Sequence, residues 1–229
     1  MKNRPHTTVV LAMTADGKIA DRKRSPARFG SPVDKAHLEK QIALADGVLF
    51  GAGTLRAYGT ILSIADRNLL QQRERENKPP QPVQIVCSRS GQIDSKLRFF
   101  QQPVPRWLLT TADGAAFWQN RPEFERIAIA KTTENGIDWV TAFTELSQLG
   151  LTRLAVLGGG ELVASLLRFD LLDELWLTVC PLILGGREAP TPVGGAGFLP
   201  ELAPRLQLLS VETVEQEVFL HYRIIRQNK

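Results

Sequence analysis

Residues 153–186 constrain the fold most, because they read as strand, glycine turn, helix, loop, strand and a second glycine turn. Arg153–Leu157 is a short apolar run that suits a strand buried on both faces. Gly158, Gly159 and Gly160 follow, and apolar residues then recur at helical spacing. Glycines here let the backbone approach a ligand, and the free N–H groups of the helix start form a natural anion site. A tight strand-to-helix turn without a ligand has the same signature.

The rest of the chain alternates strands with helices and ends in a hairpin. Strands are expected at 7–13, 47–50, 83–87, 107–110, 127–130, 139–140, 174–180, 206–214 and 217–225. Helices are expected after the N-cap Ser31, within 115–119 and over 142–149, while the polar run 71–77 is expected to be a solvated surface. This pattern predicts an α/β fold with a mostly parallel sheet and an antiparallel C-terminal hairpin, in one domain over 1–229.

Two further predicted strands are directly followed by glycine or polar residues, and we call the residues that directly follow a strand its exit. Gly51-Ala52-Gly53-Thr54 follows one buried strand, and Thr54 is expected to cap a short helix. Ser88 and Arg89 follow the next strand. Ligands of parallel sheets bind at the carboxyl ends of the strands, so these exits and Gly158–Gly160 are expected to converge on one site.

Charge and cysteine content narrow the class of protein. The net charge of +4 comes from scattered basic residues, which argues against nucleic acid as the main partner. Cys87 and Cys180 lie in apolar runs, so neither a disulfide framework nor a metal site is expected. The first apolar run is too short for a signal peptide, and no stretch has the length of a membrane span. We therefore expect a soluble, cytoplasmic protein.

Five blocks in order resemble the C-terminal reductase domain of bacterial riboflavin-biosynthesis proteins. They lie at residues 4–20, 45–55, 158–162, 171–177 and 181–186, and the resemblance extends from about residue 4 to residue 225. It implies a dihydrofolate-reductase-like fold, a homodimer, NADPH as cofactor and a phosphoribosylaminopyrimidine as substrate, whose ribosyl group is reduced to ribityl. The zinc signature of the deaminase often fused to this domain is absent from the sequence, which suits a stand-alone reductase.

The resemblance also assigns roles to residues. It places Asp16 and Lys18 near the nicotinamide and substrate as catalytic candidates, with Lys18 also in contact with the substrate. The expected cofactor-binding residues are Ala12, Gly51, Gly53, Thr54, Ser88, Arg89, Gly158, Gly159, Gly160, Glu161 and Leu162. Arg89 has the charge and shape to bind the adenosine 2′-phosphate, although an exposed turn arginine is also an ordinary surface residue.

The departures from the family pattern fall on the substrate side. Tyr58 replaces a family aspartate that contacts substrate, Ile42 and Ala65 replace arginines, and Leu157 replaces a glutamate. Tyr58 and Leu157 therefore mark the expected substrate pocket. Other nearby basic residues are expected to bind the substrate phosphate in place of the missing arginines. The candidates are Arg56, Arg67, Lys35 and Arg28, with Arg56 first.

Three functions stay open from the sequence. The first is NADPH-dependent reduction of 5-amino-6-(5-phosphoribosylamino)uracil. The second is a reductase of the same fold that acts on a different pterin, pyrimidine or carbonyl compound, which the missing charges favour. The third is a non-catalytic NADPH-binding protein, against which the retained Asp16-Gly17-Lys18 turn argues. No metal or flavin is implied, because hydride chemistry belongs to the nicotinamide.

Overall fold

The computed structural model describes residues 3–134 and 136–226, and the chain divides into two compact units. Unit 1 contains residues 39–155 with the N-terminal residues up to His6, and unit 2 contains Thr7–Leu38 and Val156 onward. The predicted single domain over 1–229 stays a prediction, and the ends of that range lie outside the described residues. Within the described ranges, no helix has both the length and the apolar character needed to cross a membrane.

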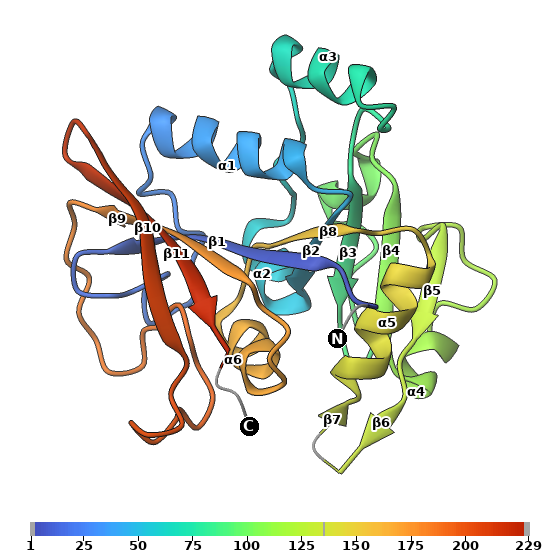
Figure 1. The fold of residues 1–229 in the computed structure, drawn as a ribbon. Coiled ribbons are helices and arrows are strands. Elements are labelled where there is room, and N and C mark those ends of the chain that lie inside the picture. The colour runs from blue at the N-terminus through green and yellow to red at the C-terminus, as the bar shows by residue number, and fades with distance from the viewer. Residues whose placement is uncertain (1–2, 135, 227–229) are drawn as a thin grey trace. The chain divides into compact units, whose positions relative to one another are not determined.

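Unit 1 is built on a sheet with strand order β8-β2-β3-β4-β5 (Figure 1). The strands are β2 (Gly47–Gly51), β3 (Val83–Cys87), β4 (Arg106–Thr110), β5 (Arg126–Ile129) and β8 (Arg153–Val156). Neighbours from β2 to β5 pair in parallel. Val48, Leu49 and Phe50 are buried, as expected of a parallel strand covered on both faces.

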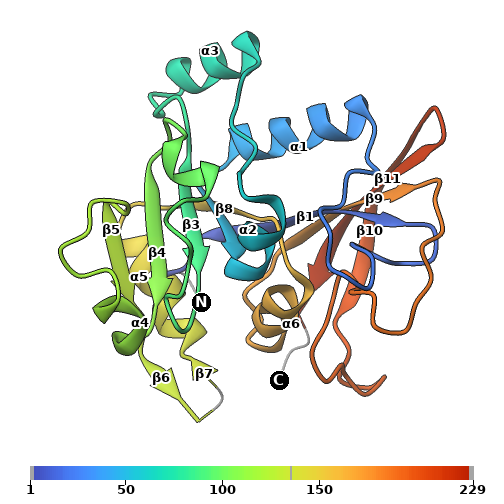
Figure 2. The same cartoon turned by 180° about the vertical axis from the view of Figure 1, so that it is seen from behind.

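The helices of unit 1 follow its strands. They are α2 (Ala52–Tyr58), α3 (Arg67–Arg75), the 3-10 helix η1 (Arg98–Gln101), α4 (Ala112–Ala116) and α5 (Trp139–Gln148); β6 (Thr132–Thr133) and β7 (Gly136–Ile137) form a small hairpin. Helix α5 lies in front of β3–β5 in Figure 1 and behind them in Figure 2, so it covers one face of the sheet. Its buried Phe143 and Leu146 supply part of that core.

Unit 2 has the strand order β10-β11-β9-β1. Its elements are β1 (His6–Thr14), α6 (Gly160–Arg168), β9 (Glu174–Cys180), β10 (Arg205–Val214), β11 (Glu217–Ile225) and the first part of α1 (Pro32–Leu44). β1 pairs with β9 in parallel, whereas β11 is antiparallel to both β9 and β10. These pairings confirm the predicted α/β fold with a mostly parallel sheet and an antiparallel C-terminal hairpin.

The sequence expectations for residues 139–140 and 71–77 of unit 1 are wrong. Trp139–Val140, expected to be a strand, begins α5, because Asp138 caps the helix and accepts hydrogen bonds from the Thr141 N–H at 3.1 Å and hydroxyl at 2.7 Å. The run 71–77 is not wholly a solvated surface, because Arg73 is 1% exposed. Burial lowers the pKa of the Arg73 guanidinium, which donates hydrogen bonds to backbone carbonyls.

Two neighbouring carboxyl groups, of half-buried Asp34 in α1 and buried Glu217 in β11, lie where α1 meets the sheet of unit 2. Ser31 caps α1 as expected, and it also donates two hydrogen bonds to Glu217, from its N–H at 2.8 Å and its hydroxyl at 2.5 Å. Burial raises the pKa of Asp34, and the negative charge of Glu217 raises it further, although Thr178 donates a hydrogen bond to the ionised form. No cation appears among the groups that shift the pKa of Asp34.

Asp34→Asn is expected to raise the free energy of unfolding by about 1 kcal/mol near neutral pH. The native state with a raised pKa binds more protons than the unfolded chain, so stability falls as pH rises from the ordinary value of 3.8 through the native pKa. Because asparagine does not ionise, Asp34→Asn removes this fall in stability with rising pH. Thermal unfolding at several pH values measures it, and Asp113→Asn, which changes an exposed first-turn aspartate of α4, is the control. An unchanged pH dependence in Asp34→Asn would contradict this interpretation.

Candidate functional site

The predicted site residues fall in both units, and each group is described within its own unit. In unit 1 the first group lies at the start of α2. Gly51 is the N-cap, without a side-chain hydrogen bond, and the first turn contains no acidic residue. A Cβ atom at Gly53 would meet no atom closer than the Arg56 guanidinium, 4.0 Å away. The space beside Gly53 is thus open and next to a cation at the start of a helix, which fits a phosphate group.

Thr54 does not cap α2, because the helix already begins at Ala52, directly after β2. It lies within the first turn, where it is half-buried. Tyr58 ends the helix with 37% of its surface exposed, and Gly59 closes α2 with a left-handed backbone at φ 67°. The expected substrate residues Arg56 and Tyr58 therefore both lie on α2, a single short element of unit 1.

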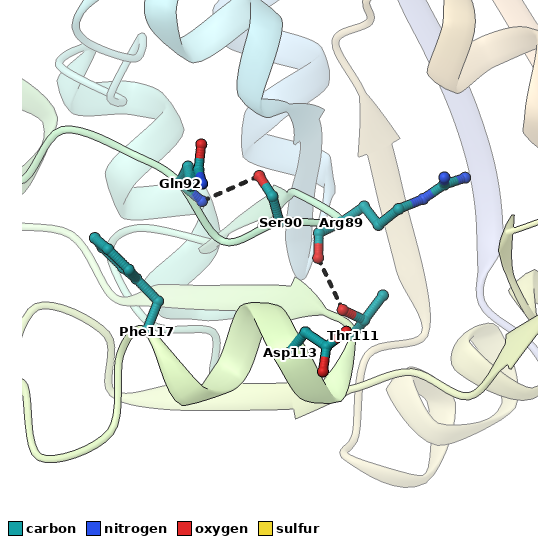
Figure 3. Close-up of a pocket in the computed structure, with 6 residues that line it drawn as sticks. All are labelled: Arg89, Ser90, Gln92, Thr111, Asp113 and Phe117. Atoms are coloured by element: carbon teal, nitrogen blue, oxygen red, sulfur yellow. Dashed lines mark hydrogen bonds between the residues drawn. The ribbon is translucent and has the colours of Figure 1, made fainter.

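The second group in unit 1 lies at the ends of β3 and β4 (Figure 3). A cavity of about 500 Å³ is lined by Arg89, Ser90, Gln92, Thr111, Asp113 and Phe117. The Thr111 hydroxyl donates a hydrogen bond of 2.8 Å to the Arg89 carbonyl and holds the two strand exits together. The Arg89 guanidinium points away from the other five side chains and lies against the backbone of Gly136. Ser88 is buried and does not line the cavity.

Sequence reasoning missed five residues of this cavity: Ser90, Gln92, Thr111, Asp113 and Phe117. Ser90 and Thr111 were detectable, since each is a polar residue just after a predicted strand. Phe117 carried no such signal, because an aromatic residue in a short helix normally indicates core. It is 44% exposed and offers a flat apolar face at the edge of the cavity.

In unit 2 the glycine turn before α6 serves internal packing. A Cβ atom on Gly160 would clash with the Thr191 carbonyl, and the Gly194 N–H donates a hydrogen bond of 3.0 Å to the Gly160 carbonyl. The Glu161 carboxylate accepts the Gly195 N–H at 3.1 Å. Segment 191–195 therefore lies across the first turn of α6 and explains the glycine at 160 without a ligand. A role of Gly158, Gly159, Gly160, Glu161 and Leu162 in cofactor binding stays a prediction.

Asp16 and Lys18 lie in the turn after β1, also in unit 2. The hydrogen bond from the Thr14 hydroxyl and those from the Gly185 and Leu184 N–H groups lower the pKa of the Asp16 carboxyl. The Lys18 ammonium donates to the Ala189 carbonyl at 3.4 Å. Ala12 lies in β1 opposite Thr178, and Leu157 follows β8; both are half-buried.

The positions that depart from the family pattern have different surroundings. Ile42 is fully buried, so a charged residue there would be costly without a partner. Ala65 is exposed, and its N–H donates a hydrogen bond of 2.6 Å to Glu39. The alternative cations Arg67, Lys35 and Arg28 are all exposed.

The fold and the strand exits place the chain in a class of proteins. These are α/β proteins in which polar and glycine-rich loops follow the carboxyl ends of parallel strands. Within this class, residues 5–220 match the model of the RibD C-terminal domain, and the chain belongs to that family. The family assignment confirms the resemblance stated from the sequence and the dihydrofolate-reductase-like fold.

Known proteins agree with this assignment. The chain is 29% identical over 197 residues to the 2,5-diamino-6-ribosylamino-4(3H)-pyrimidinone 5′-phosphate reductase of Archaeoglobus fulgidus, covering 86% of this chain and 89% of that protein. It is 27% identical to the riboflavin biosynthesis protein RibD of Actinobacillus pleuropneumoniae, covering 97% of this chain but 57% of that protein. The crystal structure of a pyrimidine reductase-like protein from Corynebacterium diphtheriae superposes with a TM-score of 0.80 at 21% identity, covering 98% of this chain and 94% of that one.

Proposed function

We propose that this chain is an NADPH-dependent reductase of riboflavin biosynthesis that converts the ribosyl group of 5-amino-6-(5-phosphoribosylamino)uracil to ribityl. The observation that carries the proposal is the family match over residues 5–220. The similarity to the Archaeoglobus fulgidus reductase, over most of both chains, supports it. A cytoplasmic location belongs to the same proposal.

The start of α2 supports the cofactor part of the proposal. Gly51 is the N-cap of α2, and the space beside Gly53 is open, with the Arg56 guanidinium next to it. This combination suits the pyrophosphate of NADPH or a substrate phosphate. The cavity at Arg89, Ser90 and Phe117 suits the adenosine end, where an aromatic face can pack against a base and Arg89 can turn toward a 2′-phosphate. When bound, NADPH supplies the hydride.

The reaction needs a hydride at C1′ of the opened sugar imine and a proton at the imine nitrogen. In unit 2 the Lys18 ammonium carries three N–H donors, of which one makes the 3.4 Å hydrogen bond to Ala189. Its positive charge suits a group that stabilises negative charge on the substrate or transfers a proton.

The purified protein is expected to oxidise NADPH when given 5-amino-6-(5-phosphoribosylamino)uracil, with the loss of NADPH absorbance as the readout. The diamino compound, the substrate without its 5′-phosphate, and NADH are the comparisons. Arg56→Ala is expected to raise the Michaelis constant for the phosphorylated substrate about tenfold or more, because it removes a charge-assisted hydrogen bond. An unchanged Michaelis constant would remove Arg56 from the substrate site. Absence of turnover with both pyrimidines would reject the proposed substrate.

The second candidate is a reductase of the same family that acts on another pterin, pyrimidine or carbonyl compound. Tyr58, exposed at the end of α2, and Leu157 favour it, because neither supplies the negative charge that the family pattern has at these positions. NADPH binding without turnover on either pyrimidine would support this candidate or the non-catalytic one. Turnover with another carbonyl compound would then distinguish these two.

The homodimer is also a proposal. β10 is the end strand of its sheet, and its side chains Leu206, Leu208 and Val211 are 45%, 50% and 54% exposed. A long edge strand with exposed apolar side chains is costly for a monomer and suits pairing with a second copy. The molar mass in solution tests this proposal, and a monomer at micromolar concentration would reject it.

A further inference from the structure

The cavity of Figure 3 lies between two loops of unit 1 that are held firmly together. The Trp118 indole N–H donates a hydrogen bond of 2.6 Å to the Gly91 carbonyl, and the Thr111 hydroxyl donates one of 2.8 Å to the Arg89 carbonyl. Gly91 and Gly114 pack backbone against backbone, so closely that a Cβ atom on either would clash with the other. These contacts hold the walls of the cavity in place without a ligand.

Helix α4 contributes an aromatic ring and a carboxylate to one wall of this cavity. Asp113 lies in the first turn of α4, and Phe117, four residues later, ends the helix in a helical conformation with φ −63° and ψ −26°. At this spacing two side chains lie one turn apart on the same side of a helix. The Phe117 ring is exposed, and the Arg121 guanidinium lies over it at 4.7 Å from the ring centroid. A ring followed by a hydrogen-bond acceptor suits a base and the ribose attached to it.

The two charges at the cavity are placed differently. Among the six residues that line it, the charged side chains are those of Asp113 and Arg89. Figure 3 shows the Arg89 side chain turned away from the other five, and its guanidinium lies against the backbone of Gly136 in β7. Asp113 lies between the N-cap Thr111 and the tightly packed Gly114. The charge held at the cavity is therefore negative, whereas the positive charge lies to one side on a long side chain.

A carboxylate and a guanidinium favour opposite forms of a nicotinamide dinucleotide. A carboxylate accepts hydrogen bonds from the adenosine ribose hydroxyls of NADH, whereas a guanidinium binds the 2′-phosphate that NADPH has in place of one of them. A carboxylate next to that phosphate repels it, and such repulsion is a general way for a site to discriminate against a ligand. Asp113 and Arg89 therefore have opposite effects on the choice between the two dinucleotides.

We propose that Asp113 is a specificity-determining residue of the cofactor site, which accepts hydrogen bonds from the adenosine ribose of NADH and weakens the binding of NADPH. The chain binds both dinucleotides, NADH with Arg89 against Gly136 and NADPH with Arg89 turned toward the 2′-phosphate. The identity of the ligand rests on the proposed function. The inference adds NADH as a second cofactor and assigns the limit on NADPH preference to one carboxylate.

Titration calorimetry of the whole protein with NADPH and with NADH tests the proposal. The parent protein is expected to bind NADH within about tenfold of its affinity for NADPH. Asp113→Asn is expected to tighten NADPH binding about tenfold without tightening NADH binding, because it removes only the repulsion of the phosphate. Arg89→Gln is expected to weaken NADPH binding about tenfold and to leave NADH binding unchanged. Asp94→Asn is the matched control, because it removes the same charge from an exposed residue outside the cavity and should change neither affinity.

Two nucleotide fragments confine the test to the adenosine end of the cofactor. The gain in Asp113→Asn is expected with adenosine 2′,5′-bisphosphate and not with adenosine 5′-monophosphate. An equal change with both fragments, or no change with either, would overturn the proposal, while NADPH binding by the parent protein would still support the cofactor part of the proposed function. If the parent protein bound neither dinucleotide, that part of the proposed function would fail, and the role of Asp113 would fail with it.

Discussion

Arg73→Met is expected to lower the free energy of unfolding by about 3–5 kcal/mol. This is the largest loss of stability that we expect at a position predicted from the sequence to be solvent-exposed. The Arg73 guanidinium is buried and donates three hydrogen bonds of 2.7 Å, to the carbonyls of Ala43, Ala45 and Pro79. Ala43 lies in the last turn of α1 and Ala45 directly follows the helix, where carbonyls lack helical partners. Methionine fills the volume but leaves these acceptors unpaired.

Thermal and urea unfolding measure this effect, and the midpoint of thermal unfolding is expected to fall by about 10 °C. Arg73→Lys should give a smaller loss, since one ammonium cannot reach all three carbonyls with the geometry of a guanidinium. Arg75→Met, on the exposed side of the same helix, is the matched control and should stay within about 0.5 kcal/mol of the parent protein. A loss in Arg73→Met no larger than in the control would show that the carbonyls find other partners.

Local sequence signals predicted most of the elements. The runs 83–87 and 174–180 are strands with the expected bounds, because their apolar and β-branched residues lie between glycine, proline and polar residues that end a strand. The N-cap Ser31 was also recognisable from the proline that follows it. At Asp138 the cap competed with the strand preference of the aromatic Trp139 and the β-branched Val140, and the cap decided the structure.

Contacts distant in sequence could not be predicted in the same way. The hydrogen bonds of Ser31 with Glu217 and of Asp16 with Gly185 join residues far apart in the chain, and neither partner carries a local signal for the other. The burial of Arg73 likewise depends on carbonyls about thirty residues earlier. The candidate site shows the same limit, since the sequence marks the glycine runs but not the different surroundings of Gly53 and Gly160.

Glycines 53 and 160 are expected to respond in opposite ways to substitution, although both lie in the first turn of a helix that follows a buried strand. Gly160→Ala should destabilise the protein by about 1–3 kcal/mol, because the added methyl group clashes with the Thr191 carbonyl. Gly53→Val should leave stability within about 1 kcal/mol, since the new side chain enters open space.

NADPH binding is expected to be sensitive to substitution at Gly53. Gly53→Val is expected to weaken NADPH binding about 100-fold, because its side chain occupies the space in which a phosphate would reach the N–H groups of α2 and the Arg56 guanidinium. Titration calorimetry with NADPH measures this loss, and thermal unfolding confirms that the variant is folded. Gly53→Ala, with a smaller side chain, should lie between the parent and the valine variant. If Gly53→Val bound NADPH as tightly as the parent, the start of α2 would not be the phosphate site, and the cofactor proposal would have to rest on the other strand exits.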